Sequence, residues 1–286
     1  MVEPHHYQIL YEVLRDIYLM DNEEELAGYI LIQISKALQT NGGTIFLAKG
    51  DHLHPMAATG IPLEELRKYE FKIGEGIAGA VAKTKAPLTV ENAKTDPRFS
   101  DTVDVKTGFV TRNITAAPIL YGQEVRGVIE FLNKIEGPFK PTDQEFITIL
   151  GKVAGLALER IHLNVELAAS EKLKQAVIES LAAGMIIVDR RLNLLIANSR
   201  AYEILGRTTA QLYPGASLAA LQPDYPAIID CVEKVLVSRA AIRRQEGLFN
   251  VNGAPKKIGY SCVPVGQKES APFGAALLFQ DITEYQ

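Results

Sequence analysis

The chain has 286 residues, of which 47% are hydrophobic and 22% charged, as in an ordinary globular protein long enough for two domains. Its formal net charge of −4 argues against a surface for nucleic acid or for an acidic membrane. Two cysteines, no secretion signal and no apolar run of membrane-spanning length favour a reducing, cytoplasmic location. His and Cys are too sparse to predict a metal site, and His5 and His6 are expected to be solvated.

The first half predicts an antiparallel sheet with helices on one side. Apolar residues at helical spacing indicate two helices between Tyr7 and Leu38, the second capped by Asn22. A turn is expected at 41–43, and the residues 92–112 look irregular and polar. The predicted strands are 44–47, 53–58, 87–90, 116–121 and 125–132.

Residues 74–79, Gly-Glu-Gly-Ile-Ala-Gly, fit the glycine fingerprint of dinucleotide-binding folds. That fingerprint must follow a buried parallel strand, but the preceding residues 64–73 are charged. The helical pattern after Gly76 also ends at Pro87, which is too soon for a parallel crossover. We therefore predict that these glycines form a sharp turn into a short, closely packed helix.

A helical pattern without proline runs from Thr142 to Leu181, with Thr142 as the expected cap and Glu145 at the capping-box position. Its length favours a coiled-coil spine shared by a homodimer, although Ser170 and Lys174 interrupt the apolar seam. Two amphipathic helices with a hinge at 168–170 are the alternative, because patterning alone does not fix the oligomeric state.

The second half again predicts an antiparallel sheet, with its helices clustered between the second and third strands. The expected strands are 184–189, 194–198, 243–249, 256–265 and 273–281, and the expected helical pieces are 199–205, 217–221 and 227–237. The fold class is therefore α+β: two domains, each a mainly antiparallel sheet with flanking helices, joined by a long helix.

The first domain resembles a GAF domain. The motifs are residues 74–79, Asp96-Pro97-Arg98-Phe99, Thr111-Arg112-Asn113-Ile114, Pro118-Ile119 and the strand Gly127 to Lys134. The second domain resembles a PAS domain, through the strand ending in Asp189, through Asn198, Leu205-Gly206 and the end Phe279 to Glu284. We assign 1–160 to GAF, 143–183 to the connecting helix that overlaps both domains, and 176–286 to PAS.

The GAF part is most similar to the cyclic-nucleotide-binding subset of phosphodiesterases and cyclases. That subset carries an N-K…F-x-x-x-D-E signature, matched here by Asn133, Lys134, Phe139 and Asp143, with Gln144 in place of the last Glu. The resemblance implies that these residues support the pocket, with Lys134 and Asp143 as an ion pair. It also implies cAMP or cGMP as the ligand, with contacts from Thr44, Asp104, Thr107 and Thr111. The alternative is that such Asp and Thr residues only cap loops.

Both families are sensory, and we find no catalytic motif, so we expect no enzyme activity. The absence of Cys before Cys231 excludes a thioether-linked bilin on the GAF part, and the PAS part has no His to ligate haem. We expect a sensor that passes ligand binding in the GAF pocket through a dimeric helix to PAS and to a downstream output domain or kinase, as in two-component systems. The alternative is a constitutive dimerisation scaffold without a ligand. The apolar PAS interior favours a filled core over a lipid-like ligand.

Overall fold

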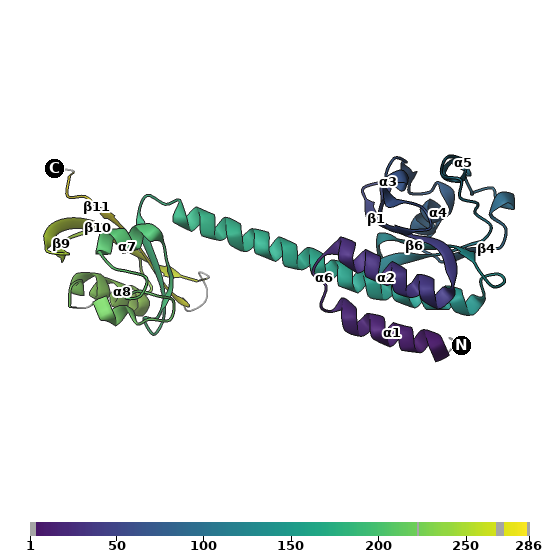
Figure 1. The fold of residues 1–286 in the computed structure, drawn as a ribbon. Helices are drawn as coiled ribbons and strands as arrows, with labels where there is room; N and C mark the ends of the chain where they lie inside the picture. The colour runs from purple at the N-terminus through teal and green to yellow at the C-terminus, as the bar shows by residue number, and fades with distance from the viewer. Residues whose placement is uncertain (1–3, 222, 267–271, 285–286) are drawn as a thin grey trace. The chain divides into compact units, whose positions relative to one another are not determined.

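A computed structural model describes residues 4–221, 223–266 and 272–284 of the chain (Figure 1). It divides into two compact units, residues 1–167 and residues 168–286. Both are mixed α and β, as the sequence predicts, and each unit is built on its own antiparallel sheet.

The sheet of the first unit has six strands in the order β3-β2-β1-β6-β5-β4, and every neighbouring pair is antiparallel. The glycine fingerprint therefore has no parallel strand before it, and the dinucleotide interpretation is excluded. The strands are β1 (Thr40–Lys49), β2 (His52–Thr59), β3 (Phe71–Lys72), β4 (Leu88–Val90), β5 (Ile114–Tyr121) and β6 (Glu124–Lys134).

Helices cover both faces of this sheet, so the prediction of helices on one side was wrong. One face carries α1 (Pro4–Ile17), α2 (Glu23–Leu38) and the first half of α6 (Pro141–Glu179). The other carries α3 (Leu63–Leu66), α4 (Gly76–Thr84), η1 (Ala93–Thr95) and α5 (Thr102–Thr107). The physical reason lies in β1, where Ile45, Phe46 and Leu47 are buried in succession, which requires cover on both faces.

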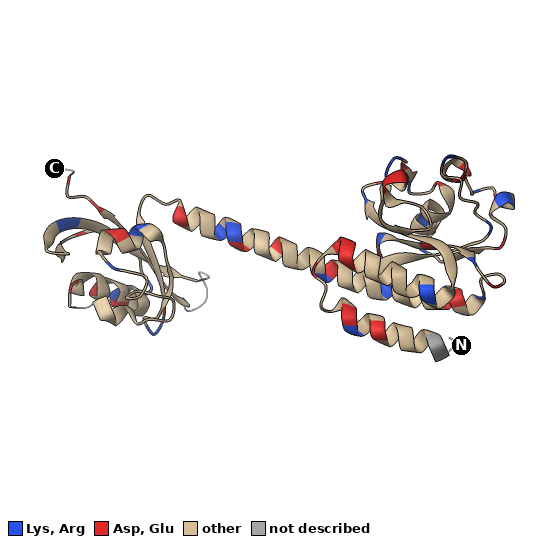
Figure 2. Cartoon of the chain, viewed as in Figure 1, with Lys and Arg blue, Asp and Glu red and all other residues tan. Residues whose placement is uncertain are grey.

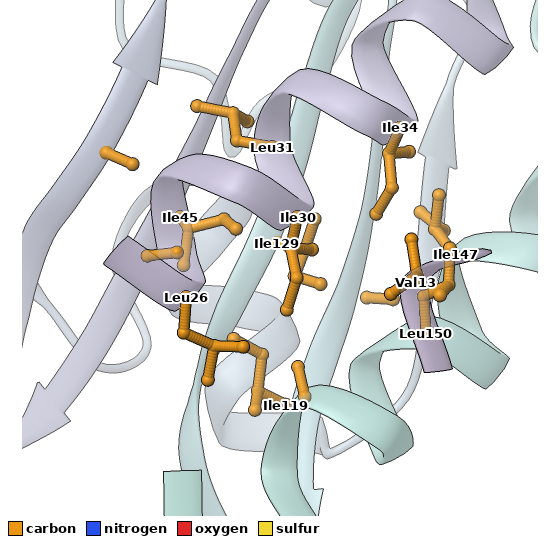
Figure 3. Packing of buried hydrophobic residues seen from close by; sticks show 14 of the residues in the cluster. Val13, Leu26, Ile30, Leu31, Ile34, Ile45, Ile119, Ile129, Ile147 and Leu150 are labelled. Carbon is orange, nitrogen blue, oxygen red and sulfur yellow. The ribbon is translucent and has the colours of Figure 1, made fainter. Parts of the chain in front are cut away.

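The larger core lies between the sheet and the long helices (Figure 3). Val13 from α1, Ile30 from α2 and Ile147 from α6 meet there, and each is at most 1% exposed. Burying a side chain of this size contributes roughly 1.5–3 kcal/mol. This packing fixes one face of β1 and β6, so that a site can be built between their other face and the short helices that cover it.

The glycines of the fingerprint form a sharp turn into a short, closely packed helix, as the sequence predicts. Gly74 and Gly76 have φ angles of +97° and +68°, in the region that favours glycine, and α4 starts at Gly76. A Cβ on Gly79 would lie 2.2 Å from the Lys72 carbonyl oxygen, so α4 packs directly on β3. The expected turn at 41–43 was wrong: these residues belong to β1, and α2 ends at left-handed Gln39 instead.

Helix α6 runs unbroken for 39 residues, without a hinge at 168–170. Its predicted cap, Thr142, lies inside the first turn, because the helix begins at Pro141. The carboxylate of Asp143 accepts a hydrogen bond of 2.7 Å from the backbone N–H of Lys140. Asp143 therefore takes the capping-box position that the sequence assigned to Glu145.

The second unit has five strands in the order β8-β7-β11-β10-β9, again all antiparallel. Its core lies between the sheet and the helices α7, η2 and α8. Asn198 caps α7, and its side chain also binds Met185 of β7 and the carbonyls of Ile178 and Ala183. The elements are β7 (Gly184–Asp189), β8 (Leu194–Ala197), α7 (Ser199–Leu205), η2 (Leu218–Leu221), α8 (Pro226–Ser238), β9 (Ile242–Val251), β10 (Ala254–Val265) and β11 (Gly274–Asp281).

Candidate ligand-binding site

A cavity of about 280 Å³ lies in the first unit, between the second face of the sheet, the helices α3 and α4, and the segment 92–112, which we call the lid. Its volume is near the lower end of the range for small-ligand sites. Aromatic side chains form part of the wall: Phe46, Tyr69, Phe71 and Phe99. The charged residues of the lining are Glu70, Lys72, Glu75, Asp104 and Glu130, so acids outnumber the single lysine.

Thr44 and Glu130 form the floor of the cavity. They face each other across the β1–β6 pair, and Thr44 is only 4% exposed. No hydrogen-bond partner of the Glu130 carboxylate is found within the described residues. Burial raises the pKa of this carboxyl to about 7, because its charged form is poorly solvated. The surface that Glu130 keeps faces the cavity, which its position among lining residues shows.

Glu130 was not among the residues predicted from the sequence, although the strand pattern around it contains a signal. It is the only charged residue within Val128 to Leu132, a stretch whose other four residues are apolar and buried. Ile129 and Phe131 belong to the core on the opposite face of the sheet. The alternation of a strand therefore turns the Glu130 side chain toward the cavity.

The amino end of α4 forms another part of the wall. Gly76, Ile77 and Ala78 line the cavity, and their N–H groups lie in the first turn, which has no partners within the helix. The preceding Glu75 makes no side-chain cap. Such an end carries a partial positive charge and suits an anionic group.

Three of the four predicted contact residues line the cavity: Thr44, Asp104 and Thr111. Asp104 accepts hydrogen bonds of 2.7 Å from both the backbone N–H and the hydroxyl of Thr111, so these two residues hold the lid together. Thr107 is not among the residues that line the cavity. Its hydroxyl donates to the Val103 carbonyl and accepts from the Phe109 N–H.

The lid is connected to α6 through the end of β6. Buried Asn133 binds the Arg112 N–H and the Val110 carbonyl at 2.7 Å each, in a left-handed conformation with φ of +58°. The next residue, Lys134, forms an ion pair with Asp143 at the start of α6. Phe139 is 6% exposed, and its ring lies 5.9 Å from the Lys134 ammonium. These four residues thus join the lid, the strand and the helix.

His6 and the two cysteines lie outside the cavity lining. The expectation that His6 is solvated was wrong: it is 3% exposed, and its ring stacks on Phe146 with centroids 4.3 Å apart. The side chain of His5 lies outside the described residues. Cys231 and Cys262 are buried, and burial raises the pKa of the Cys262 thiol to about 12, which makes it a poor nucleophile.

Within the described ranges, no three His, Cys, Asp or Glu side chains gather as metal ligands would. In the same ranges, no helix combines the length and the apolar character that crossing a membrane requires.

Comparison with known proteins agrees with this architecture. The model of the GAF domain matches residues 22–158, and that of the PAS fold matches residues 172–282. A probable 3′,5′-cyclic phosphodiesterase of Caenorhabditis elegans is 38% identical over 119 residues, covering 42% of this chain and 16% of the relative. The cone cGMP-specific 3′,5′-cyclic phosphodiesterase subunit alpha′ of Bos taurus is 30% identical over 170 residues, covering 54% of this chain and 20% of the relative. The chain therefore spans a fifth or less of the length of these two relatives.

Among solved structures, the GAF domain of a phosphoenolpyruvate-protein phosphotransferase from Coxiella burnetii matches with a TM-score of 0.52 and 17% identity. The match covers 57% of this chain and 97% of the Coxiella burnetii domain. At 17% identity, the match shows the fold alone. GAF and PAS domains are regulatory and sensory domains. The chain is a tandem of a GAF domain followed by a PAS domain, and its GAF part is homologous to those of cGMP-specific phosphodiesterases.

Proposed function

We propose that the GAF domain binds a cyclic nucleotide, with cGMP favoured over cAMP, and that the chain is a signal-sensing regulatory module. The observation that carries this proposal is Glu130: a carboxyl on the cavity floor, without a hydrogen-bond partner in the described chain, in the same cavity as the amide end of α4. A partly buried acid in that state costs free energy, and a ligand with matching donors offsets the cost.

The cyclic phosphate would bind at the first turn of α4. Four acids and one lysine line the cavity, so side-chain charge does not attract an anion. The backbone N–H groups of Gly76, Ile77 and Ala78 are donors that can bind the phosphate without any positively charged side chain. Among the predicted contacts that line the same cavity, Thr111 can donate through its hydroxyl, and its bond to Asp104 must rearrange if it binds the ligand.

The base would lie on the floor, against Thr44 and Glu130. Guanine offers two adjacent donors, N1–H and the N2 amino group, and an ionised carboxylate accepts both. Adenine presents an acceptor at N1, which an ionised Glu130 would repel. Guanine therefore suits this floor better at pH values above the pKa of Glu130, about 7. The cone phosphodiesterase, a cGMP-specific relative of this chain, supports the same preference.

Ligand binding would reach α6 through the lid. Asn133 holds the lid backbone, and Lys134 next to it binds Asp143 at the first turn of α6. A lid that closes on a ligand would therefore pull on the end of β6 and on the start of α6. We propose that residues 143–183 form a homodimeric coiled coil and pass this change to the PAS domain and to a downstream output domain or kinase.

A constitutive scaffold is the second candidate. The hydrogen bonds of the lid favour it, because the lid is held by bonds within the chain: Thr111 donates to Asp104, and the Arg112 N–H donates to Asn133. In that case the cavity would be a remnant of the fold, and neither nucleotide would bind.

Thermal unfolding of the purified chain with about 1 mM cAMP or cGMP separates the two candidates. A ligand at a hundredfold excess over its Kd adds about 2.7 kcal/mol, which raises the Tm by several degrees. We expect the larger shift with cGMP, its loss in Glu130→Gln, and an unchanged shift in the control Glu124→Gln at the exposed start of the same strand. No shift with either nucleotide would contradict the sensor and support the scaffold.

A further inference from the structure

Strand β1 contains two adjacent glycines, Gly42 and Gly43, at the place where the sequence predicted a turn. Glycine weakens the interior of a strand, and it often marks a point where another group approaches closely. A Cβ on Gly43 would lie 2.8 Å from Cδ1 of Phe131 and 3.1 Å from Cδ1 of Leu31, so Gly43 makes room for the larger core. Gly42 makes room for a different side chain.

The side chain beside Gly42 is the ring of Phe109, which belongs to the lid. A Cβ on Gly42 would lie 3.0 Å from the Phe109 Cζ atom, and a Cβ on Gly60, just after β2, would lie 3.2 Å from its Cε2 atom. Gly60 has a φ of +81°, so its backbone conformation also favours glycine. Gly42 and Gly60 together form what we call the glycine seat of the Phe109 ring.

The glycine seat lies on the cavity side of the sheet. Positions 42, 44 and 46 share one face of β1, because side chains alternate along a strand, and Thr44 and Phe46 line the cavity. Gly42 is paired with Leu132 of β6, which lines the cavity too. Phe109 packs, partly buried, against the same core cluster as Phe46. Its ring therefore attaches the lid to the sheet beside the cavity floor.

The hydrogen bonds of the lid hold its two ends. The Ala93 N–H donates to the Arg112 carbonyl at 2.7 Å, which ties the beginning of the lid to its end. Asn133 of β6 accepts a hydrogen bond from the Arg112 N–H. The bonds between Asp104 and Thr111 lie within the lid, so they shape it without attaching it to the sheet. The span between the two ends therefore depends on side-chain packing to stay closed.

Phe109 is the best placed of the side chains that could hold this span. Exposed charged residues of both signs lie on the lid and stay solvated whether it is open or closed (Figure 2). The ammonium of Lys106 lies 5.7 Å from the centroid of the Tyr69 ring, but a cation–π contact of an exposed lysine is weak. Phe99 packs from the cavity wall, where part of its ring faces space. The Phe109 ring instead removes apolar surface from water against the sheet itself.

We propose that Phe109 is the latch of the lid: its ring, in the seat formed by Gly42 and Gly60, keeps the lid closed and limits how fast a ligand enters and leaves the cavity. The tie between Ala93 and Arg112 serves as the hinge when the ring leaves the seat. Phe109 is not among the residues that line the cavity, so it acts by positioning the lid. The effect on ligand rates rests on the proposed cyclic-nucleotide binding, whereas the closure of the lid does not.

Amide hydrogen exchange of the full chain without nucleotide tests the latch. Phe109→Ala should speed exchange of residues 94–108 about tenfold, because local opening becomes easier, and should leave exchange in the core of β1 and β6 unchanged. The control is Val110→Ala at the adjacent position, where the side chain is 58% exposed, and it should leave the lid unchanged. Unchanged lid exchange in Phe109→Ala, or equal acceleration throughout the GAF sheet, would overturn the proposal.

A variant of the seat tests the same contact from the other side. The methyl group of Gly42→Ala would lie 3.0 Å from the ring and should displace it, which also speeds lid exchange. In a Phe109→Ala background the ring is gone, so Gly42→Ala should add less than about a twofold change. The Thr59 carbonyl oxygen, 3.2 Å from the same Cβ, is present in both backgrounds and cancels in this comparison. Effects that multiply would mean that the two residues act independently, and the seat would be wrong.

Stopped-flow binding of a fluorescent cGMP analogue separates the latch from the proposed function. Phe109→Ala should raise the association and the dissociation rate constants together, several-fold each, with a smaller change in Kd, as loss of a gate does. A faster dissociation with an unchanged association would show that Phe109 stabilises the bound state alone, which would overturn the gating role. If the unmodified chain binds no cGMP, the proposed function fails, and the exchange experiments decide whether Phe109 holds the lid closed.

Discussion

The GAF and PAS domains share an antiparallel sheet with packed helices, yet their interiors differ. In GAF, the sheet face that carries Thr44 and Glu130 looks onto a cavity of about 280 Å³. In PAS, the inner sheet face meets apolar side chains such as Ile186, Ile228 and Phe279, each at most 1% exposed. The buried Tyr225 hydroxyl there already donates to the Leu205 carbonyl at 2.7 Å.

The hydrogen bonding of buried polar groups distinguishes a ligand-binding domain from one with a filled core. In the described part of PAS, a buried polar group such as Asn198 has all its hydrogen bonds supplied by the chain. In GAF, Glu130 does not, although leaving such a group unpaired costs about 1–3 kcal/mol or more. We infer that GAF is the domain that binds the ligand and that the interior of PAS is filled by its own side chains.

The largest expected effect comes from removing an aromatic ring from each interior. Phe279→Ala should lower the free energy of unfolding of PAS by about 3–5 kcal/mol, since it opens a cavity in a filled core. Phe99→Ala in the wall of the GAF cavity should cost less than about 1.5 kcal/mol, because one side of that ring already faces space. Urea unfolding of both variants measures this, and equal losses would remove the distinction between the interiors.

Two buried asparagines allow the next comparison. Asn133→Ala should cost GAF about 2–3 kcal/mol, since the Arg112 N–H and the Val110 carbonyl lose their partner. It should also speed amide exchange of the lid. Asn198→Ala should destabilise PAS by a comparable amount and leave exchange in the lid unchanged. A lid unaffected by Asn133→Ala would show that Asn133 does not hold it.

The pH dependence of GAF should carry the signature of Glu130. Because burial raises its folded-state pKa from 4.5 to about 7, the folded domain binds this proton more tightly than the unfolded chain does. The resulting stability is present below pH 4.5 and is lost as pH rises to about 7, by up to about 3 kcal/mol. Glu130→Gln mimics the protonated form, so it should stabilise apo GAF by about 1–3 kcal/mol at pH 8 and by little at pH 5. Equal effects at both pH values, measured by chemical unfolding, would contradict the assigned pKa.

The smallest effect is expected at Asp281 in PAS, with the opposite sign in pH. The Lys256 ammonium, 2.9 Å away, and the Thr283 hydroxyl lower the pKa of this carboxyl to about 2. Its contribution is therefore present above pH 3.8 and lost as pH falls through about 2. Asp281→Asn should cost only about 0.5–1 kcal/mol at pH 7, because the pair is partly exposed to solvent. A larger loss would indicate that this pair supports more of PAS than its contacts suggest.

Periodicity and turn residues were sufficient to predict the α+β class, most strands and the long helix. The short helices α3 and α5 were missed, because four to six residues give too little periodicity to recognise. Helices on both faces were missed as well, although the unbroken apolar run Ile45 to Leu47 signals a strand covered on both sides.

The candidate site was only partly accessible from the sequence. Thr44, Asp104 and Thr111 were proposed from a family resemblance, and they do line one cavity. Glu130 required the structure, because a lone acid in a strand reads equally well as a solvent-facing residue until the cover on both faces is known. The burial of His6 also required it, since the position of α1 on α6 depends on contacts between residues about 140 positions apart.

Amide hydrogen exchange of the full chain, with and without saturating cGMP, tests whether the GAF domain is the one that binds the nucleotide. We expect protection of the lid, residues 92–112, and of the first turn of α4, together with unchanged exchange in the core strands of PAS. Unchanged exchange in the lid and α4, or protection confined to the PAS interior, would contradict the assignment of GAF as the ligand-binding domain.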